Sequence, residues 1–139
     1  MGALHIEEKM HQMVGKLLPD TGWSNLLTQA QVFTSGRAQS VLDEHHIKRT
    51  RYAHQVSLMG LSLLRQKSYS SYCLTVEGPH EPIEIWAQKS RTSNMMFMFW
   101  STVMDLELLM CRFTRSLREG DFQLYCMSRS VMSYAPGSM

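Results

Sequence analysis

The sequence predicts an all-α fold, an irregular bundle of about five to seven helices around a long central helix at 95–118. Apolar residues recur at spacings of three and four along most of the chain, which is the period of a helix face. Prolines and glycines gather between these stretches, where they interrupt helices. Strict alternation of apolar and polar residues, the period of a strand, is not convincing anywhere, although 71–76 could form a short strand.

Seven helices are expected, in chain order at 4–18, 23–31, 35–44, 47–74, 81–89, 95–118 and 122–132. Pro19 stops the first of them, and Thr-Ser-Gly at 34–36 separates the second from the third. The fourth helix carries an apolar stripe that we expect to face the core, made of Tyr52, Val56, Met59 and Leu63. Gly60 lies inside this stripe and costs about 1 kcal/mol relative to alanine, unless another helix packs closely against it.

The boundaries of the later helices follow from local signals. Two prolines and a glycine make 76–82 a loop. Ser93 or Asn94 caps the central helix, whose middle is apolar on nearly all sides, and Gly120 ends it. Asp121 caps the last helix.

The size of the chain predicts one domain over 1–132, followed by a tail at 133–139 that we expect to fray. Apolar residues make up 44% of the 139 residues and charged residues 19%, which excludes a wholly disordered protein. Fourteen Lys and Arg against twelve Asp and Glu give a net charge of +2. This charge is too small for a general attraction to nucleic acids or anionic membranes.

Three cysteines, without a Cys-x-x-Cys pair, argue against a disulfide framework and against a structural zinc site. The acidic N-terminal stretch does not resemble a signal peptide. The longest apolar run, at 95–100, is far shorter than the roughly 20 residues of a membrane span. We therefore expect an intracellular protein, nuclear or cytoplasmic, without a membrane partner.

Four blocks of sequence resemble one family. They are Leu-His-Ile-Glu at 4–7, Gly-Trp-Ser-Asn-Leu-Leu-Thr-Gln-Ala at 22–30, Arg-Thr-Arg-Tyr-Ala-His-Gln-Val at 49–56, and the stretch from Phe-Trp at 99–100 to Gln-Leu-Tyr at 123–125. In this order they resemble the C-terminal part of multicopy open reading frames of animal genomes. Those long proteins are regarded as derived from mobile elements and resemble transposases with an RNase H-like catalytic region and a helical insertion.

The resemblance covers roughly residues 1–125. Family members are much longer on the N-terminal side, and their Pro-Trp-Phe and Asp-His motifs are missing from 126–139. The resemblance therefore implies a fragment of a larger domain, a non-catalytic remnant without independent activity. Two alternatives are a nucleic-acid-binding fragment of a transposase or nuclease, and a helical protein–protein interaction module.

The family chemistry points to Glu107. RNase H-like transposases hold two divalent metals with three carboxylates, and the third lies on a helix after an insertion. The resemblance implies that Glu107 is this catalytic acid, with Mg²⁺, only in a full-length relative; Asp105 is the second choice. For this chain alone we expect no cofactor and no metal site. The alternative is that Glu107 pairs with an arginine of another helix, such as Arg51.

Two basic clusters could contact nucleic-acid phosphates, and they comprise Lys48, Arg49, Arg51, Arg112, Arg115 and Arg118. Tyr52 could stack on a base, or it could lie in the core beside a solvated basic face. The alternative for the last three arginines is that they stabilise the C-terminal end of their own helix, where positive charge is favourable. We expect weak DNA binding at most, and exposed apolar residues could cause self-association.

The acids at the start of the chain have a simpler expectation. Glu7 and Glu8 are predicted to be solvated in the first turn of a helix, where acids are favourable. Glu8 and His11 are expected to be the near-facing acid–imidazole pair of this helix.

Overall fold

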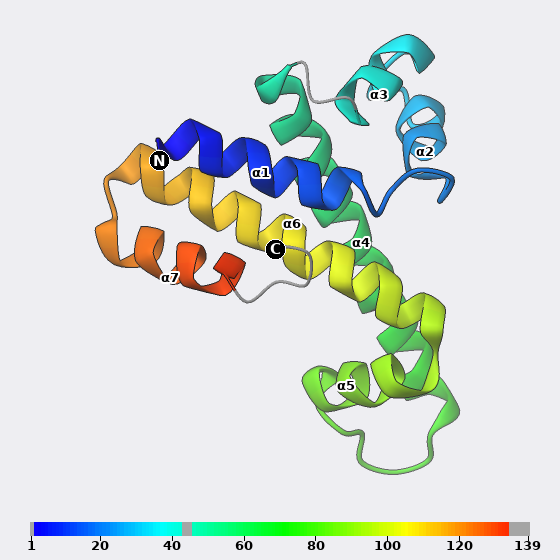
Figure 1. The fold of residues 1–139 in the computed structure, drawn as a ribbon. Helices are drawn as coiled ribbons and strands as arrows, with labels where there is room; N and C mark the ends of the chain where they lie inside the picture. The colour runs from blue at the N-terminus through cyan, green and yellow to red at the C-terminus, as the bar shows by residue number, and fades with distance from the viewer. Residues whose placement is uncertain (1, 43–45, 134–139) are drawn as a thin grey trace.

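The computed structural model describes residues 2–42 and 46–133, and it confirms the all-α fold (Figure 1). Every regular element within these residues is a helix, and they are α1 (Ala3–Gly15), α2 (Trp23–Gln29), α3 (Ser35–Leu42), α4 (Ile47–Thr75), α5 (Ile83–Ser93), α6 (Met95–Glu119) and α7 (Phe122–Ser133). The predicted end of the third helix at Glu44 and the predicted tail from 134 onward lie outside the described residues.

Three boundary predictions were wrong. The helix expected at 81–89 is α5, which begins at Ile83 and continues to Ser93. The segment 71–76 is not a strand, because α4 continues through it to Thr75. Tyr69 and Tyr72 on this last part of α4 both pack on the ring of Trp86 from α5, which fixes the helix end against its neighbour. The first helix ends at Gly15 rather than at Leu18, and the chain then turns through the left-handed conformations of Asp20 and Gly22.

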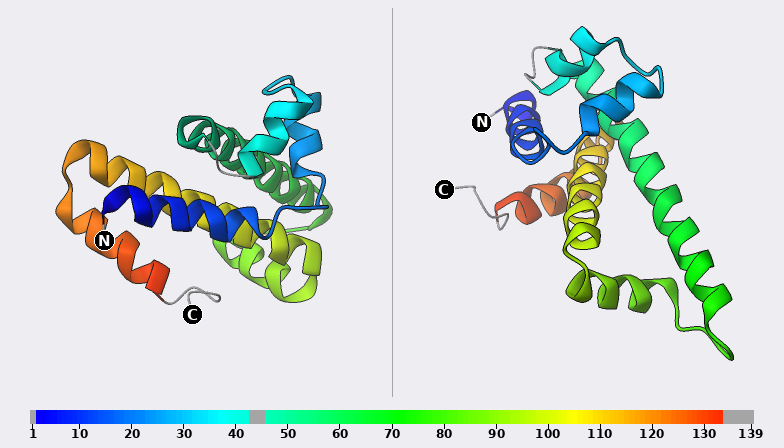
Figure 2. Two further views of the ribbon diagram at one scale, coloured as in Figure 1. Left: turned by 45° about the horizontal axis from the view of Figure 1, so that its top comes forward. Right: turned by 90° about the vertical axis from the view of Figure 1, so that its right-hand side faces the viewer.

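Helix α6 is the centre of the fold, as predicted for 95–118. It packs against α1, α4, α5 and α7, and its Val103 and Phe113 are completely buried. Helix α4 lies beside α6 near its own start and diverges from it toward its end, where α5 bridges the two (Figure 2, right). None of the helices in the described part of the chain combines the length and the apolar character needed to span a bilayer.

The ends of α6 confirm the local signals of the sequence. Asn94, and not Ser93, is the N-cap, because its side-chain oxygen accepts a hydrogen bond from the backbone of Phe97 at 3.0 Å. Gly120 ends the helix in the left-handed conformation, with φ of 66°. Asp121 accepts a hydrogen bond from the backbone of Leu124 at 2.9 Å and so begins α7.

Replacing Asn94 with alanine is expected to lower the free energy of unfolding by about 1 kcal/mol, since the cap hydrogen bond is lost. Urea denaturation measures this change. The Ser93→Ala variant is the control, because the hydroxyl of Ser93 bonds only to carbonyls of its own helix. Equal stabilities of the two variants would contradict the assignment of the cap.

Candidate functional site

Helices α1, α4 and α6 bring five polar side chains together inside the protein, and we call them the buried polar cluster: Glu7, His11, Arg51, His54 and Glu107. The spacing of four on α1 and of three on α4 places each pair on one face of its helix. Thr114 of α6 lies beside the cluster, and its hydroxyl donates to Oε1 of Glu7 from 107 positions away in the sequence.

Glu7 and Arg51 form a bidentate ion pair between α1 and α4. Nε of Arg51 donates to Oε1 of Glu7, and Nη2 donates to Oε2 at 2.6 Å. The hydrogen bonds to Glu7 raise the pKa of Arg51 above its ordinary value. Glu7 is only 1% exposed, so the prediction that it is solvated at a helix start was wrong. The alternative that Arg51 pairs with Glu107 was also wrong, because the helix faces bring Glu7 to it instead.

Glu107 is completely buried, and both of its oxygens have partners from α4. Nδ1 of His54 lies 2.8 Å from Oε2, and the hydroxyl of Ser57 donates to Oε1 at 2.9 Å. The same hydroxyl accepts a hydrogen bond from Nε1 of Trp23 at 2.8 Å. Burial raises the pKa of Glu107, while the hydrogen bonds from His54 and Ser57 act against this shift.

His11 is the other buried histidine of the cluster. Burial is the main reason that its pKa falls from 6.5 to about 4; nearby His54 and Arg51 add to this shift, while Glu7 opposes it. His11 is therefore neutral at pH 7. It faces Glu7 at 4.0 Å, whereas Glu8 lies 3.8 Å from His5, so the predicted Glu8–His11 pair was wrong.

The hydrogen bonds of this cluster link α1 to α4 and α4 to α6. Ser57 donates to one oxygen of the Glu107 carboxylate, and His54 contacts the other oxygen of that carboxylate. No three His, Cys, Asp or Glu side chains of the described residues are grouped to hold a metal ion. The catalytic role of Glu107 in a full-length relative, and the Mg²⁺ that it implies, stay predictions.

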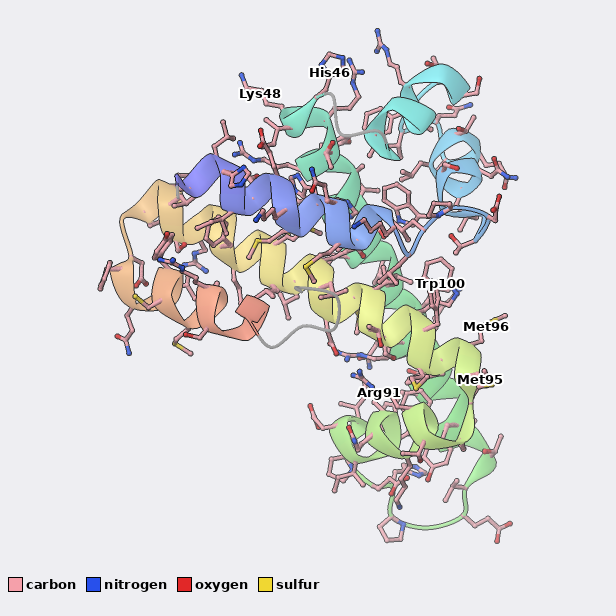
Figure 3. The ribbon with its side chains drawn as sticks, in the orientation of Figure 1. His46, Lys48, Arg91, Met95, Met96 and Trp100 are labelled. Carbon is pink, nitrogen blue, oxygen red and sulfur yellow. The ribbon has the colours of Figure 1, made fainter. Side chains whose placement is uncertain are left out.

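The six basic residues predicted to contact nucleic acid differ in their exposure to solvent and in their ion pairs. Lys48 is exposed at the start of α4 (Figure 3). The three arginines of α6 are also exposed, while Arg49 is half-buried. Arg51 donates to Glu7, and Arg115 pairs with Glu119 at 3.0 Å. Tyr52 is 52% exposed and meets the edge of the Phe33 ring, so its placement in the core was wrong. Contact of these cations with DNA stays a prediction.

Asp105, the second choice for the catalytic acid, is exposed and accepts a hydrogen bond from Arg91 at 2.7 Å.

An apolar groove with a volume of about 640 Å³ lies between α2, α4 and α6, directly beside the buried polar cluster. Trp23 and Ser57 belong to its wall. The view in Figure 2, right, faces α4 and α6 below α2, and Figure 3 shows Trp100 and Met96 projecting from α6 on this side. The rim is open, since Leu26, Leu64 and Met96 are 59%, 61% and 72% exposed.

Sequence reasoning missed this groove. The stripe of α4 expected to face the core is exposed from Met59 to Leu63, because α4 diverges from its neighbours there. Gly60 is also exposed, and a Cβ added to it would meet nothing within 4 Å, so no helix of the described residues packs closely against it. The available signal was that apolar residues surround α4 over 59–64 without one dominant face.

Comparisons with protein-family models, with curated proteins and with solved structures found no match to this chain.

Proposed function

We propose that this chain is a helical protein–protein interaction module that binds an amphipathic helix of a partner protein in the apolar groove. The observation that carries the proposal is the groove itself, which has a volume of about 640 Å³ and an exposed rim of leucine and methionine. Monomeric proteins rarely leave a large contiguous apolar patch in water, and such patches mark interaction sites.

The shape of the groove favours a helix over a small molecule. Its volume falls within the range of small-ligand pockets, roughly 300–1,000 Å³, but those pockets bury most of their ligand. Here the rim is open, and the apolar surface continues beyond it to exposed Met95 on the first turn of α6 (Figure 3). A helix of about 10 Å diameter can lay one apolar face into such a groove while its other face stays in water.

The buried polar cluster supports the binding of a partner by fixing the walls of the groove. Ser57, held by Glu107, accepts the indole hydrogen bond of Trp23, so the ring that forms one wall has a fixed orientation. His54 stacks on the same indole, with ring centroids 5.1 Å apart. A groove that is ordered before binding loses little entropy when it is occupied.

A synthetic 18-residue helical peptide with leucines at positions i, i+3, i+4 and i+7 is the probe for this function. We expect saturable binding, followed through the fluorescence of Trp23 and Trp100, and none with a scrambled peptide. Leu64→Glu is expected to weaken binding at least tenfold, because it places a charge on the rim.

Leu74→Glu is the matched control. This leucine lies on the same helix and is fully exposed, but it does not line the groove. Circular dichroism checks that both variants fold. Absence of saturable binding to the wild-type chain, or equal effects of the two substitutions, would refute the proposed function.

Two other functions stay predictions: a non-catalytic remnant of a mobile-element-derived protein and a nucleic-acid-binding fragment. A remnant without activity would bind neither peptide. A nucleic-acid-binding fragment would bind DNA with an affinity that falls steeply with salt, which a filter-binding series at rising salt concentration measures.

A further inference from the structure

From two residues of α4 in this groove, we infer that the partner helix is acidic, with a carboxylate against Arg65 and a small residue against Gly60. This inference rests on the proposed function, since it concerns the chemistry of the helix that occupies the same groove.

Arg65 is the residue that would favour an acidic partner helix. Among the described residues that line the groove, Arg65 is the charged one, so no carboxylate shares the lining with it. Its side chain is half-buried, and no hydrogen bond or ion pair to it occurs within the described part of the chain. By contrast, Arg51 and Arg91 each have a carboxylate partner. A guanidinium offers five donors in a planar fork that suits a carboxylate, so a partner with an acid at this point satisfies it.

Gly60 provides the point of close approach. It interrupts the interior of a 29-residue helix, where glycine is unfavourable, and the described residues make no close contact that requires it. It lines the groove together with Ser57, one turn earlier on α4. Small side chains on one helix let a second helix approach more closely, and here the open groove supplies the space for it.

The spacing of these two residues defines the partner more narrowly. Arg65 lies five positions after Gly60, which is about 7.5 Å along the axis of α4. On a partner helix that follows α4, this length corresponds to about five positions. Four positions, or about 6 Å, is the nearest spacing that keeps its small residue and its carboxylate on one helix face, next to the leucines that fill the groove.

Two peptides with identical leucine stripes test this inference, one with glutamate and alanine four positions apart, and one with lysine in place of glutamate. Titration calorimetry at low salt is expected to show at least tenfold tighter binding of the glutamate peptide. Arg65→Glu is expected to reverse this preference. Lys67→Glu makes the same change of charge on an exposed position of α4 outside the groove and is expected to keep the preference.

Gly60→Ala gives an independent readout. The variant is expected to denature at higher urea concentration than the wild-type chain, because alanine favours the helix and its methyl group meets no other side chain. Its affinity for the glutamate peptide is nevertheless expected to fall at least threefold, since the methyl group blocks the close approach.

The outcomes separate the inference from the function on which it rests. Equal affinities for the two peptides, or an Arg65→Glu variant that behaves as Lys67→Glu does, would overturn the acidic partner while the interaction module stands. Binding of neither peptide would overturn the module itself. If light scattering shows a dimer that Leu64→Glu dissociates, the occupant is a second copy and the acidic partner is excluded.

Discussion

Replacing Glu107 with leucine is expected to lower the free energy of unfolding by about 3–5 kcal/mol. The carboxylate is completely buried and holds both His54 and Ser57. Leucine has a similar volume but accepts no hydrogen bond, so the buried His54 and the half-buried Ser57 lose their acceptor. Urea denaturation followed by circular dichroism measures the change.

Two variants isolate the cause of that loss. Glu107→Gln keeps the shape and an acceptor for Ser57, and we expect it to cost about 1 kcal/mol. Asp105→Asn removes an acid two positions earlier, where an exposed ion pair with Arg91 contributes less than about 1 kcal/mol. A leucine variant as stable as the glutamine variant would show that the hydrogen bonds of Glu107 do not hold α4 and α6 together.

The stability of the chain is expected to fall as the pH decreases from about 6.5 to about 4, and His11 is the reason. Its pKa is about 4 in the folded protein and 6.5 in the unfolded chain. Below pH 6.5 the unfolded chain binds a proton that the folded protein does not bind, so protonation favours unfolding. The difference in pKa corresponds to a loss of about 3 kcal/mol, complete near pH 4.

Comparison with the His11→Gln variant isolates this effect, because Glu107 acts with the opposite sign. The raised pKa of Glu107 means that the folded state keeps its proton longer, so its contribution to stability decreases as the pH rises above 4.5. Glu7, Arg51 and His54 also face His11, and they are present in both proteins. We expect the wild-type curve of stability against pH to be steeper than the curve of the variant between pH 4 and 6.5.

His5→Gln is the control for the pH measurement. It replaces a histidine on the same helix that is exposed to water. Its curve is expected to run parallel to that of the wild-type chain. If the His11→Gln curve is also parallel, burial does not shift the titration of His11.

The sequence by itself determined the helices and several of their ends. Helical periodicity predicted the fold class and a central helix at 95–118, because the 3.6-residue repeat is a local property of the chain. Gly120 and Asp121 were readable for the same reason, and the N-cap was narrowed to Ser93 or Asn94, since each such signal acts on backbone groups within five residues of itself.

Only the tertiary structure decided which helix faces meet. Periodicity shows that Glu7 and His11 share a face of α1, but nothing local pairs Glu7 with Arg51, 44 positions away, or His54 with Glu107, 53 positions away. The groove also depends on tertiary structure, because it exists only where α4 diverges from α6. The physical reason is that the sequence fixes the chemistry of each helix surface, whereas the packing of several helices at once selects the surfaces that become buried.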